Sequence, residues 1–486
     1  MHGDNYLSIR IFYIIAFFAG VQLVGECATQ RAHPNIIYIL ADDLGWKDLG
    51  CYGSVLNQTP NIDRLADQGT RFTQAYAMSV CSPTRAATLS GKHAARLKFT
   101  IWREATFNEP GGRRPLLDAN TIHDLPIDIP VLPGELKKLG YLNFHVGKWH
   151  LGDGDHAPQT YGFDVNIGGT HWGAPMTFFH PFSGTGRFGP TFRYVPGLGL
   201  GKPGDYLTDR LTEEALLLID SAGDRPFFLN LCYYSPHTPI EGKDEYVKKF
   251  KQNIRDGMRQ QNAEYAAMVY SLDENVGRIM QKLDDLNISD HTIVIFASDN
   301  GGYIGVDSRS GHQVPTTDNF PLRSGKGSLY EGGIRVPLVI RIPGTDTEGA
   351  VCHNPVTCMD IFPTLMDLIG HPRREYNNSS AMDGRSFAIL LKNPDVILPA
   401  KDLYFHYPHY YPTTSPVSAI RSGRWKLLEF FESDSVELYD LENDLSESTD
   451  LSEMRMDIVN DLKSRLQTWR QSVDAELPGI NSNSTR

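Results

Sequence analysis

The sequence predicts an α/β protein with a large, mostly parallel central sheet flanked by helices. Two observations lead to this prediction. Short apolar runs alternate with helical stretches along the chain, which is typical of parallel strands that are buried on both faces. The chain has 486 residues, of which 41% are hydrophobic, enough for one large core with an appendage.

Five apolar runs are predicted strands, namely residues 35–40, 141–146, 226–234, 292–298 and 335–343. Helical periodicity predicts two long helices between them, at 205–222 and 263–286. Beyond about residue 400, short strand-like runs and turns precede an amphipathic helical pattern at 456–473. The change of pattern predicts a smaller C-terminal subdomain over 401–478, after a main domain over 28–400 and before a short tail over 479–486.

The N-terminus has the pattern of an export signal. Arg10 precedes the apolar run IFYIIAFFAGVQLV, which is too short to span a bilayer comfortably. Gly25-Glu26-Cys27 then offers a small-x-small cleavage site. We predict a signal peptide over residues 1–27, no stable membrane span, and export to a periplasmic, extracellular or lysosomal-type compartment; a retained membrane anchor is the alternative.

Charge and cysteine content exclude some functions. The net charge of −12 argues against a nucleic-acid scaffold, but a local basic site for a small anion remains compatible with it. Five cysteines follow the predicted signal peptide, so at least one is unpaired. Cys352 and Cys358 are the first candidates for a disulfide if any pair forms.

Acidic residues follow two of the predicted strands. Asp42 and Asp43 come after the first strand, and Asp299 and Asn300 come after the fourth. Ligands of open α/β sheets bind outside the carboxyl ends of the strands, so these side chains are expected in one site. Carboxylate and amide oxygens suit Ca²⁺, with Mg²⁺ as second choice. The alternative is that both pairs are turn caps.

Basic residues occur on several loops near this predicted site. Lys148 and His150 alternate around Trp149, so they point to one side if the segment is extended. His237 lies in SPHTP, and Lys326 lies in a glycine-rich stretch. Together with Arg85 they could neutralise a tetrahedral oxyanion beside a divalent metal. A sulfate or phosphate ester is therefore the expected substrate, although each basic residue alone could be a surface or capping group.

The stretch CSPTRAATLSG (81–91) places a cysteine at a predicted helix start. Pro83 suits the first helical turn, because its missing N–H would be unpaired there. Cys81 then lies where backbone amides and the helix dipole stabilise an anion. A buried cysteine beside a helix cap is the simpler alternative.

Taken together, these segments resemble the formylglycine-dependent (type I) sulfatases of the alkaline phosphatase-like superfamily. Residues 81–85 fit the signature C-x-P-x-R, and GKWHLG (147–152) resembles the second signature. ADDLG, SDNGG and KGSLYEGG match in the expected order. The resemblance runs from about residue 33 into the C-terminal region, and it implies an alkaline phosphatase-like sheet with a smaller antiparallel-sheet subdomain and a packed helix.

The resemblance also implies roles for the site residues. A formylglycine-generating enzyme would oxidise Cys81 to Cα-formylglycine, whose hydrate attacks sulfur. The calcium ligands would be Asp42, Asp43, Asp299 and Asn300, completed by residue 81 or a sulfate oxygen. Arg85 and Lys148 would hold the diol and sulfate oxygens, and His150 would take the proton that drives sulfate elimination. His237 and Lys326 would bind sulfate and help to protonate the leaving oxygen.

The expected substrate is a sulfated small molecule or saccharide. His171 and His312 are candidate sugar contacts, because they lie in the segments 170–194 and 308–327 that are expected to shape the pocket. His406 lies in the aromatic stretch 404–412, which could stack on a sugar or form a packed hinge. Two alternatives remain open: a phosphate or phosphonate monoester hydrolase of the same superfamily, and an inactive saccharide-binding relative. The oligomeric state is left open.

Overall fold

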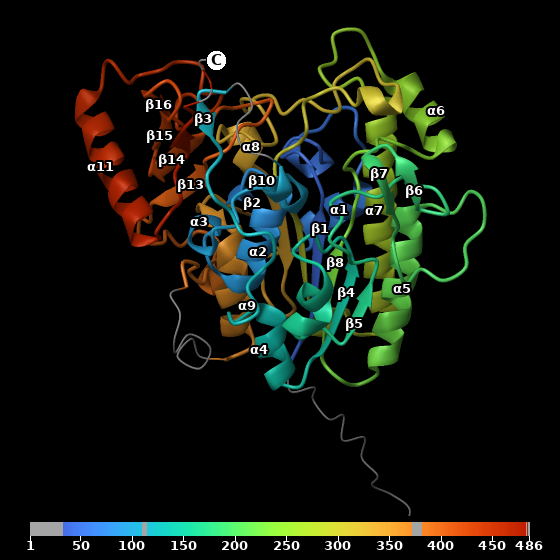
Figure 1. Cartoon of the computed structure of the whole chain (residues 1–486). Helices are drawn as coiled ribbons and strands as arrows, with labels where there is room; N and C mark the ends of the chain where they lie inside the picture. The colour runs from blue at the N-terminus through green and yellow to red at the C-terminus, as the bar shows by residue number, and fades with distance from the viewer. Residues whose placement is uncertain (1–32, 109–113, 372–381, 483, 485–486) are drawn as a thin grey trace, which may run out of the picture. The chain divides into compact units, whose positions relative to one another are not determined.

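The computed structural model describes residues 33–108, 114–371, 382–482 and 484 (Figure 1). Pro34–Arg486 form one compact unit. The predicted signal peptide, residues 1–27, lies outside the described residues. Within the described ranges, every helix is too short or too polar to cross a bilayer.

The central sheet contains nine strands in the described part of the chain. β1 (Asn35–Ala41) lies at its centre, parallel to β8 (Phe227–Cys232) on one side and to β9 (Thr292–Ser298) on the other. The sheet continues beyond these strands with β4 (Leu142–Gly147), β5 (Val165–Ile167), β10 (Arg335–Arg341), β2 (Thr70–Tyr76), β11 (Ala350–Cys352) and β12 (Val356–Thr357). All pairs are parallel except those that β10 forms with β9 and β2.

The alternation of side chains along β1 explains why the sheet is covered on both faces. Ile37 and Ile39 belong to the core on one side, and Ile36, Tyr38 and Leu40 belong to the core on the other. Each is nearly fully buried, and burying such a side chain stabilises the fold by about 1.5–3 kcal/mol. A strand with apolar side chains on both faces is typically buried between two layers of helices.

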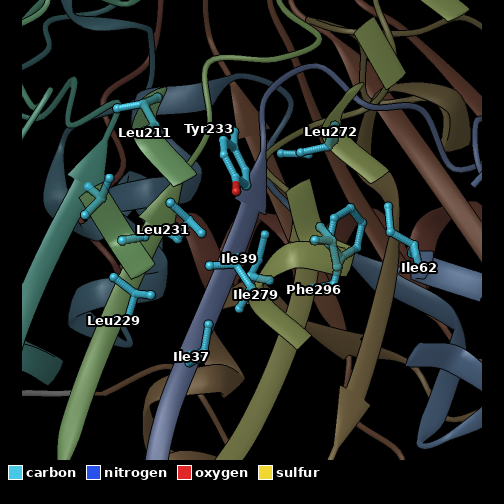
Figure 2. Packing of buried hydrophobic residues seen from close by; sticks show 14 of the residues in the cluster. Ile37, Ile39, Ile62, Leu211, Leu229, Leu231, Tyr233, Leu272, Ile279 and Phe296 are labelled. Carbon is cyan, nitrogen blue, oxygen red and sulfur yellow. The ribbon is translucent and has the colours of Figure 1, made fainter. Parts of the chain in front are cut away.

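Two helical layers supply this cover. Figure 2 shows Ile37 and Ile39 beside residues from the helices on one face: α1 (Pro60–Asp67), α5 (Leu207–Ala222) and α7 (Ala263–Asp285). The core on the other face includes residues of α2 (Cys81–Ser90), α4 (Leu132–Lys138) and α9 (Ile361–Leu368). The two predicted long helices are thus α5 and α7, each within two residues of its predicted start. Asn262 caps α7 by accepting a hydrogen bond from the backbone N–H of Tyr265 at 3.1 Å.

The C-terminal region forms a separate antiparallel sheet of four strands: β13 (Leu403–Tyr407), β14 (Val417–Ser422), β15 (Trp425–Phe430) and β16 (Ser435–Asp440). Ile420 and Leu427 on one face pack against Leu462 and Leu466 of α11 (Met456–Ser472). The other face belongs to a core that includes Tyr76 at the end of β2. The small sheet therefore lies between its own helix and the main part of the unit, and it begins three residues after the predicted boundary at residue 400.

The remaining elements are short. β17 (Gly479–Ile480) pairs with β3 (Leu116–Leu117), so the start of the predicted tail returns to the main part of the unit. The others are α3 (Ala94–Leu97), α6 (Asp244–Asn253), α8 (Glu331–Ile334), β6 (Gly184–Gly186), β7 (Gly189–Arg193) and 3₁₀ turns at Gly50–Tyr52, Arg103–Phe107, Gly154–His156, Pro158–Tyr161, Ser289–His291, Ser308–Ser310, Cys358–Asp360 and Ala388–Leu391.

The structure confirms the fold class, with all five predicted strands present. The predicted strand at 335–343 is β10, whose direction opposes that of its neighbours. The disulfide considered between Cys352 and Cys358 is not formed, and the cysteines of the described chain are all free thiols.

A buried ion cluster joins the two sheets. Lys426 of β15 lies 3.0 Å from Glu331 of α8 and 2.8 Å from Glu447, and all three side chains are fully buried. Glu331 also accepts a hydrogen bond from Tyr76 at 2.8 Å. Glu331 has a second cation, Arg335 at 3.3 Å, so it is Glu447 that relies on the ammonium group from the small sheet.

Replacement of this lysine should destabilise the protein strongly. Lys426→Ala takes the cation away from buried Glu447 and leaves Glu331 with Arg335 alone, 3.3 Å away. We expect the free energy of unfolding to fall by about 3–5 kcal/mol. Lys137→Ala is the control, because Lys137 is half exposed in its 2.8 Å ion pair with Asp164 and should cost less than about 1 kcal/mol. Urea unfolding followed by tryptophan fluorescence measures both; equal effects would contradict the expected role of the cluster.

Candidate active site

The acidic residues meet because two neighbouring strands end in register. Ala41 of β1 lies opposite Ser298 of β9, so Asp42 and Asp43 follow one strand where Asp299 and Asn300 follow the next. The backbone N–H of Asp299 donates to the carbonyl of Ala41 at 3.1 Å, which continues the ladder beyond the strand ends. β8 and β4, on the other side of β1, end at the same edge of the sheet.

Each of the three carboxylates forms an ion pair with a lysine or an arginine. Lys148 Nζ lies 2.7 Å from Asp42 Oδ2, and Lys326 Nζ lies 2.7 Å from Asp43 Oδ1. The guanidinium of Arg85 lies 2.7 Å from Asp299 Oδ2. Burial opposes the charged form of Lys148, yet its pKa is raised because Asp42 lies against the ammonium group. The predicted metal ligands and the predicted anion-binding cations therefore form one compact, matched set.

Two oxygen atoms of this set remain without a partner among the described residues. They are Asp42 Oδ1 and Asn300 Oδ1, and both are buried. The amide nitrogen of Asn300 donates to Asp43 Oδ1 at 2.8 Å, so its oxygen is left free to act as a ligand. Such orphaned acceptors are costly unless something binds them.

These residues fit a hard divalent cation. Ligand atoms of Asp42, Asp43 and His237 lie within 4.8 Å of one another. Burial and the neighbouring charge of Asp299 raise the pKa of Asp42, an electrostatic cost that a bound cation would relieve. Both Asp299 oxygens already accept hydrogen bonds, Oδ2 from Arg85 and Oδ1 from the backbone N–H of Asp43 at 3.2 Å.

Cys81 is the first residue of α2 and is only 2% exposed. Its Sγ lies 3.3 Å from His150 Nδ1. Burial raises the pKa of the Cys81 thiol, against the lowering effect of Lys148 and Lys326. Ser82 fixes the helix start, because its hydroxyl donates to the carbonyl of His150 at 2.9 Å. The N-terminus of α2 is thus tied to the segment that follows β4.

His150 reaches Cys81 by a route that the sequence analysis did not predict. Lys148 and His150 were expected on one side of an extended segment, but Gly147 and His150 have φ values of +98° and +62°. The chain therefore turns after β4, and the backbone N–H of His150 donates to the carbonyl of Thr170. Lys148 is fully buried under the site beside Asp42, whereas His150 lies at the cavity wall.

Glu104, in the 3₁₀ turn Arg103–Phe107, was missed. Its carboxylate contacts His150 Nε2 and accepts a hydrogen bond from the backbone N–H of Gly173 at 2.7 Å. Burial lowers the pKa of His150 to about 4, against the raising effect of Glu104. Burial alone would raise the pKa of Glu104, but His150, Gly173 and Arg193 hold it well below its usual range. A single Glu outside any motif does not indicate a functional role in the sequence, because only the folded chain brings Glu104 next to His150.

His237 faces the same site from the loop after β8. Its Nε2 lies 3.6 Å from Asp43 Oδ2, and its Nδ1 lies 2.8 Å from the carbonyl of Thr238. Asp307 holds this loop by accepting hydrogen bonds from the Thr238 hydroxyl and the Ile240 N–H. Burial and the nearby ammonium of Lys326 lower the pKa of His237 to about 3, against the attraction of Asp43.

A cavity of about 430 Å³ opens onto these groups. Its lining includes Cys81, Asp43 and Lys326, together with four aromatic side chains, those of Trp102, Phe188, Tyr303 and Tyr411. The segments 170–194 and 308–327 contribute Gly173, Ala174, Phe188, Arg193, Ser308, Arg309 and Lys326 to the lining. Both segments thus shape the pocket, as expected.

Tyr411, which belongs to the aromatic stretch 404–412, lines the cavity. Its ring lies over Gly327, where a Cβ would approach within 2.1 Å of the ring. Thr413 donates to the carbonyl of Lys326 at 2.7 Å. The loop between β13 and β14 therefore holds the backbone that carries Lys326.

None of the three histidines proposed as sugar contacts lines the cavity. Both ring nitrogens of His406 are engaged, with Ser418 Oγ at 2.6 Å and the carbonyl of Glu476 at 2.8 Å. The packed-hinge alternative therefore describes His406. His312 Nε2 contacts the carbonyl of Ile240 at 2.8 Å, and His171 Nδ1 lies 3.3 Å from Asp153. Each histidine is engaged with neighbouring protein groups, a pairing that sequence position alone does not reveal.

Two family models match the chain. The model described as Sulfatase covers residues 34–371, and the model described as N-sulphoglucosamine sulphohydrolase, C-terminal, covers residues 325–472. The first contains the central sheet and nearly all of the groups described above, and the second contains the small antiparallel sheet and α11.

Individual proteins give the same result. The chain is 31% identical to a sulfatase of Formosa agariphila over 90% of this chain and 88% of that protein. It is 33% identical to the N-acetylgalactosamine-6-sulfatase of Homo sapiens over 69% of this chain and 62% of that protein. The solved structure of Ps i-CgsB in complex with k-i-k-neocarrahexaose matches with a TM-score of 0.72 and 32% identity over 90% of this chain and 92% of that chain. The chain belongs to the sulfatase family, with its alkaline phosphatase-like fold, and is a hydrolase of sulfuric ester bonds.

Proposed function

We propose that this chain hydrolyses the sulfate ester of a saccharide through residue 81, after oxidation of Cys81 to Cα-formylglycine. The observation that supports this proposal is the position of Cys81, buried at a helix N-terminus and 3.3 Å from His150 Nδ1. Hydration of the aldehyde gives two hydroxyl groups, one to attack sulfur and one to release the product. A helix N-terminus stabilises the negative charge that develops there.

The charge balance of the site favours an anionic substrate. Three carboxylates are matched by three basic side chains, so the set is close to neutral before a metal binds. When bound, a Ca²⁺ ion, with Mg²⁺ as second choice, would supply Lewis-acid polarisation of a sulfate oxygen. Asp42 and Asn300 would hold this ion through their unpaired oxygens, with Asp43 and Asp299 beside them. The excess positive charge would then be available to the sulfate group.

Arg85, Lys148 and His150 have roles around residue 81 in this proposal. Arg85 and Lys148 hold the diol and sulfate oxygens from beneath. A hydroxyl of residue 81 bonds to sulfur and gives up its proton while the bond from sulfur to the alcohol oxygen breaks, and the alcohol oxygen takes up that proton. His150 then accepts the proton of the second hydroxyl, the aldehyde re-forms and sulfate leaves with the electrons of its bond to carbon. Water restores the diol, so the net reaction consumes one water for each ester.

His237 and Lys326 act on the leaving-group side. Both line the cavity and both lie against Asp43, 3.6 Å and 2.7 Å away. From there they bind a sulfate oxygen, and the neutral His237 passes the proton released by the attacking hydroxyl to the departing alcohol. A leaving alcohol of high pKa depends most on this proton.

The cavity supports a sulfated saccharide as substrate. Its aromatic wall offers apolar faces to sugar rings, and Trp102 packs edge-on against Tyr411 at 5.5 Å, which keeps both rings in place. The comparison with Ps i-CgsB, solved with k-i-k-neocarrahexaose, also points to a saccharide.

Burial of Cys81 constrains how the protein matures. Every residue of α2 is buried in the folded chain, so the thiol is out of reach of another protein once folding is complete. We infer that a formylglycine-generating enzyme acts on Cys81 before or during folding. We also propose that the predicted signal peptide, residues 1–27, directs export of the protein.

Parallel assays on the sulfate and phosphate esters of one aryl alcohol test the proposed reaction. We expect hydrolysis of the sulfate ester to be the faster reaction, and Cys81→Ala to abolish it with the fold intact. Cys81→Ser should release one equivalent of alcohol and then stop, because a serine sulfate ester lacks the second hydroxyl. Mass spectrometry of the peptide containing residue 81 should show loss of sulfur and gain of oxygen.

Each other outcome of these assays has a definite meaning. Faster hydrolysis of the phosphate ester would favour a phosphate or phosphonate monoester hydrolase. Binding of a sulfated saccharide without turnover would indicate an inactive relative. An unmodified thiol in fully active protein would contradict the role of the aldehyde.

Removal of the metal should remove activity with it. Asp43→Asn takes away one carboxylate of the cluster, and we expect loss of the bound Ca²⁺ with a fall in turnover of roughly 10²–10³-fold. Metal analysis of the purified protein, before and after chelation, measures the content directly. Asp220→Asn is the control, since Asp220 forms a surface ion pair with Lys282 at 2.6 Å. This variant should leave the Ca²⁺ content and the turnover unchanged. Two zinc ions per chain would count against this site.

Replacement of His150 and replacement of His237 should each block a different step of the reaction. His150→Ala should release a first equivalent of alcohol and then stall with sulfate held on residue 81. His237→Ala should instead slow that first release, most of all for leaving alcohols of high pKa. Rapid-quench measurement of the first turnover, with an activated aryl sulfate and a sugar sulfate, separates the two. His353→Ala serves as control, because His353 is exposed and contacts Thr73 outside the site; equal losses without a burst in both variants would mean that these roles are wrongly assigned.

A further inference from the structure

We propose that Glu104 is the positioning residue that fixes the tautomer and ring orientation of His150, so that the unprotonated Nδ1 faces residue 81. The inference rests on the proposed function, because it explains how His150 can accept a proton there. It also assigns a role to a charged residue at the cavity wall.

The hydrogen-bond chemistry of the carboxylate determines the tautomer. Glu104 Oε2 contacts His150 Nε2, and an ionised carboxylate can only accept hydrogen bonds. The proton of the neutral imidazole therefore belongs on Nε2. Nδ1, 3.3 Å from Cys81 Sγ, keeps its lone pair and is directed at the reacting residue.

The second oxygen of Glu104 is fixed independently. Glu104 Oε1 accepts the backbone N–H of Gly173 at 2.7 Å and lies 3.5 Å from the guanidinium of Arg193. The guanidinium of Arg193 lies over the rings of Trp172 and Phe188, at 4.7 Å and 4.4 Å from their centroids. Both donors belong to the segment 170–194, so this loop holds the carboxylate against the histidine.

Gly173 restrains the ring from a further direction. A Cβ at this position would lie 2.3 Å from Cε1 and 2.6 Å from Nε2 of His150. Only a residue without a side chain allows the loop to approach the imidazole so closely. The ring is thus held by a hydrogen bond at one edge and by backbone contact, and its rotation would require the loop to move.

This arrangement matches the chemistry that His150 would perform. In the proposed release step the second hydroxyl of residue 81 gives its proton to Nδ1, the C=O bond forms, and the C–O bond to sulfate breaks. The imidazole then carries a positive charge, which the Glu104 carboxylate stabilises through Nε2–H. The proton passes on to water when the aldehyde hydrates again, so the imidazole returns to its starting form.

Glu104→Gln tests the inference sharply, because an amide cannot satisfy all three partners. Its oxygen can face Gly173 and Arg193, which are both donors, only if its NH₂ group faces His150. Nε2 must then act as acceptor, and the proton of the imidazole moves to Nδ1. We expect turnover to fall roughly 10²–10⁴-fold, with the first equivalent of alcohol still released and sulfate retained on residue 81.

Two further measurements separate positioning from simple structural support. Nitrogen NMR of isotope-labelled histidine, with His150 assigned from the spectrum of His150→Ala, should show the proton on Nε2 in the native protein and on Nδ1 in Glu104→Gln. The double variant Glu104→Gln/His150→Ala should turn over no more slowly than His150→Ala alone, because both changes remove the same function. The midpoint of thermal unfolding should be nearly unchanged by Glu104→Gln.

Asp153→Asn is the matched control. Asp153 lies 3.3 Å from His171, the other histidine–carboxylate pair near this loop, and it does not line the cavity; turnover should be unchanged. Native turnover in Glu104→Gln with an unchanged tautomer would overturn the inference. A raised KM without retained sulfate would overturn it too, by showing that Glu104 contacts the substrate. If the native protein cleaves no sulfate ester, the proposed function fails, and the tautomer measurement on the free protein still decides the role of Glu104.

Discussion

The parallel pairing of β1 with β9 is the constraint on which the site depends. Because Ala41 and Ser298 are opposite one another, the acidic residues that follow both strands emerge at one point of the sheet edge. Hydrophobic burial on both faces of β1 makes a change of register costly, since a shift by one residue would exchange the side chains that face each helical layer. The stability of the core and the geometry of the acidic cluster therefore have the same origin.

Ion pairing then links this edge to segments that are distant in the sequence. Asp42, Asp43 and Asp299 each bind a basic residue from a different element, so the acidic cluster organises the loops around it. Buried pairs of this kind contribute little net stability over apolar packing, but they are costly to break. They are better understood as fixing the position of groups that a metal ion and a sulfate ester would use. Two buried oxygens, on Asp42 and Asn300, have no partner among the described residues and lie in the same cluster.

Loops from outside the central sheet complete the site. The segment 170–194 brings Gly173 and Arg193 to Glu104, and the loop after β13 places Tyr411 over Gly327. The small C-terminal sheet is therefore more than an appendage, because its loop supports the backbone that carries Lys326. The buried contact between Lys426 and Glu331 holds that sheet against the main part of the unit.

The sequence by itself determined the fold class, the five strands and the acidic and basic residues at their ends, because apolar periodicity and strand-end polarity are local properties of the chain. It did not determine that β10 runs against its neighbours, because strand direction follows from the path of the connections. Only the tertiary structure decided which cations pair with which carboxylates. It also places His406 outside the cavity, where both of its ring nitrogens contact other protein groups. The role of Glu104 could not be predicted from the sequence for the same reason. Its contact with His150 joins residues 46 positions apart, and only the packing of the folded chain brings them together.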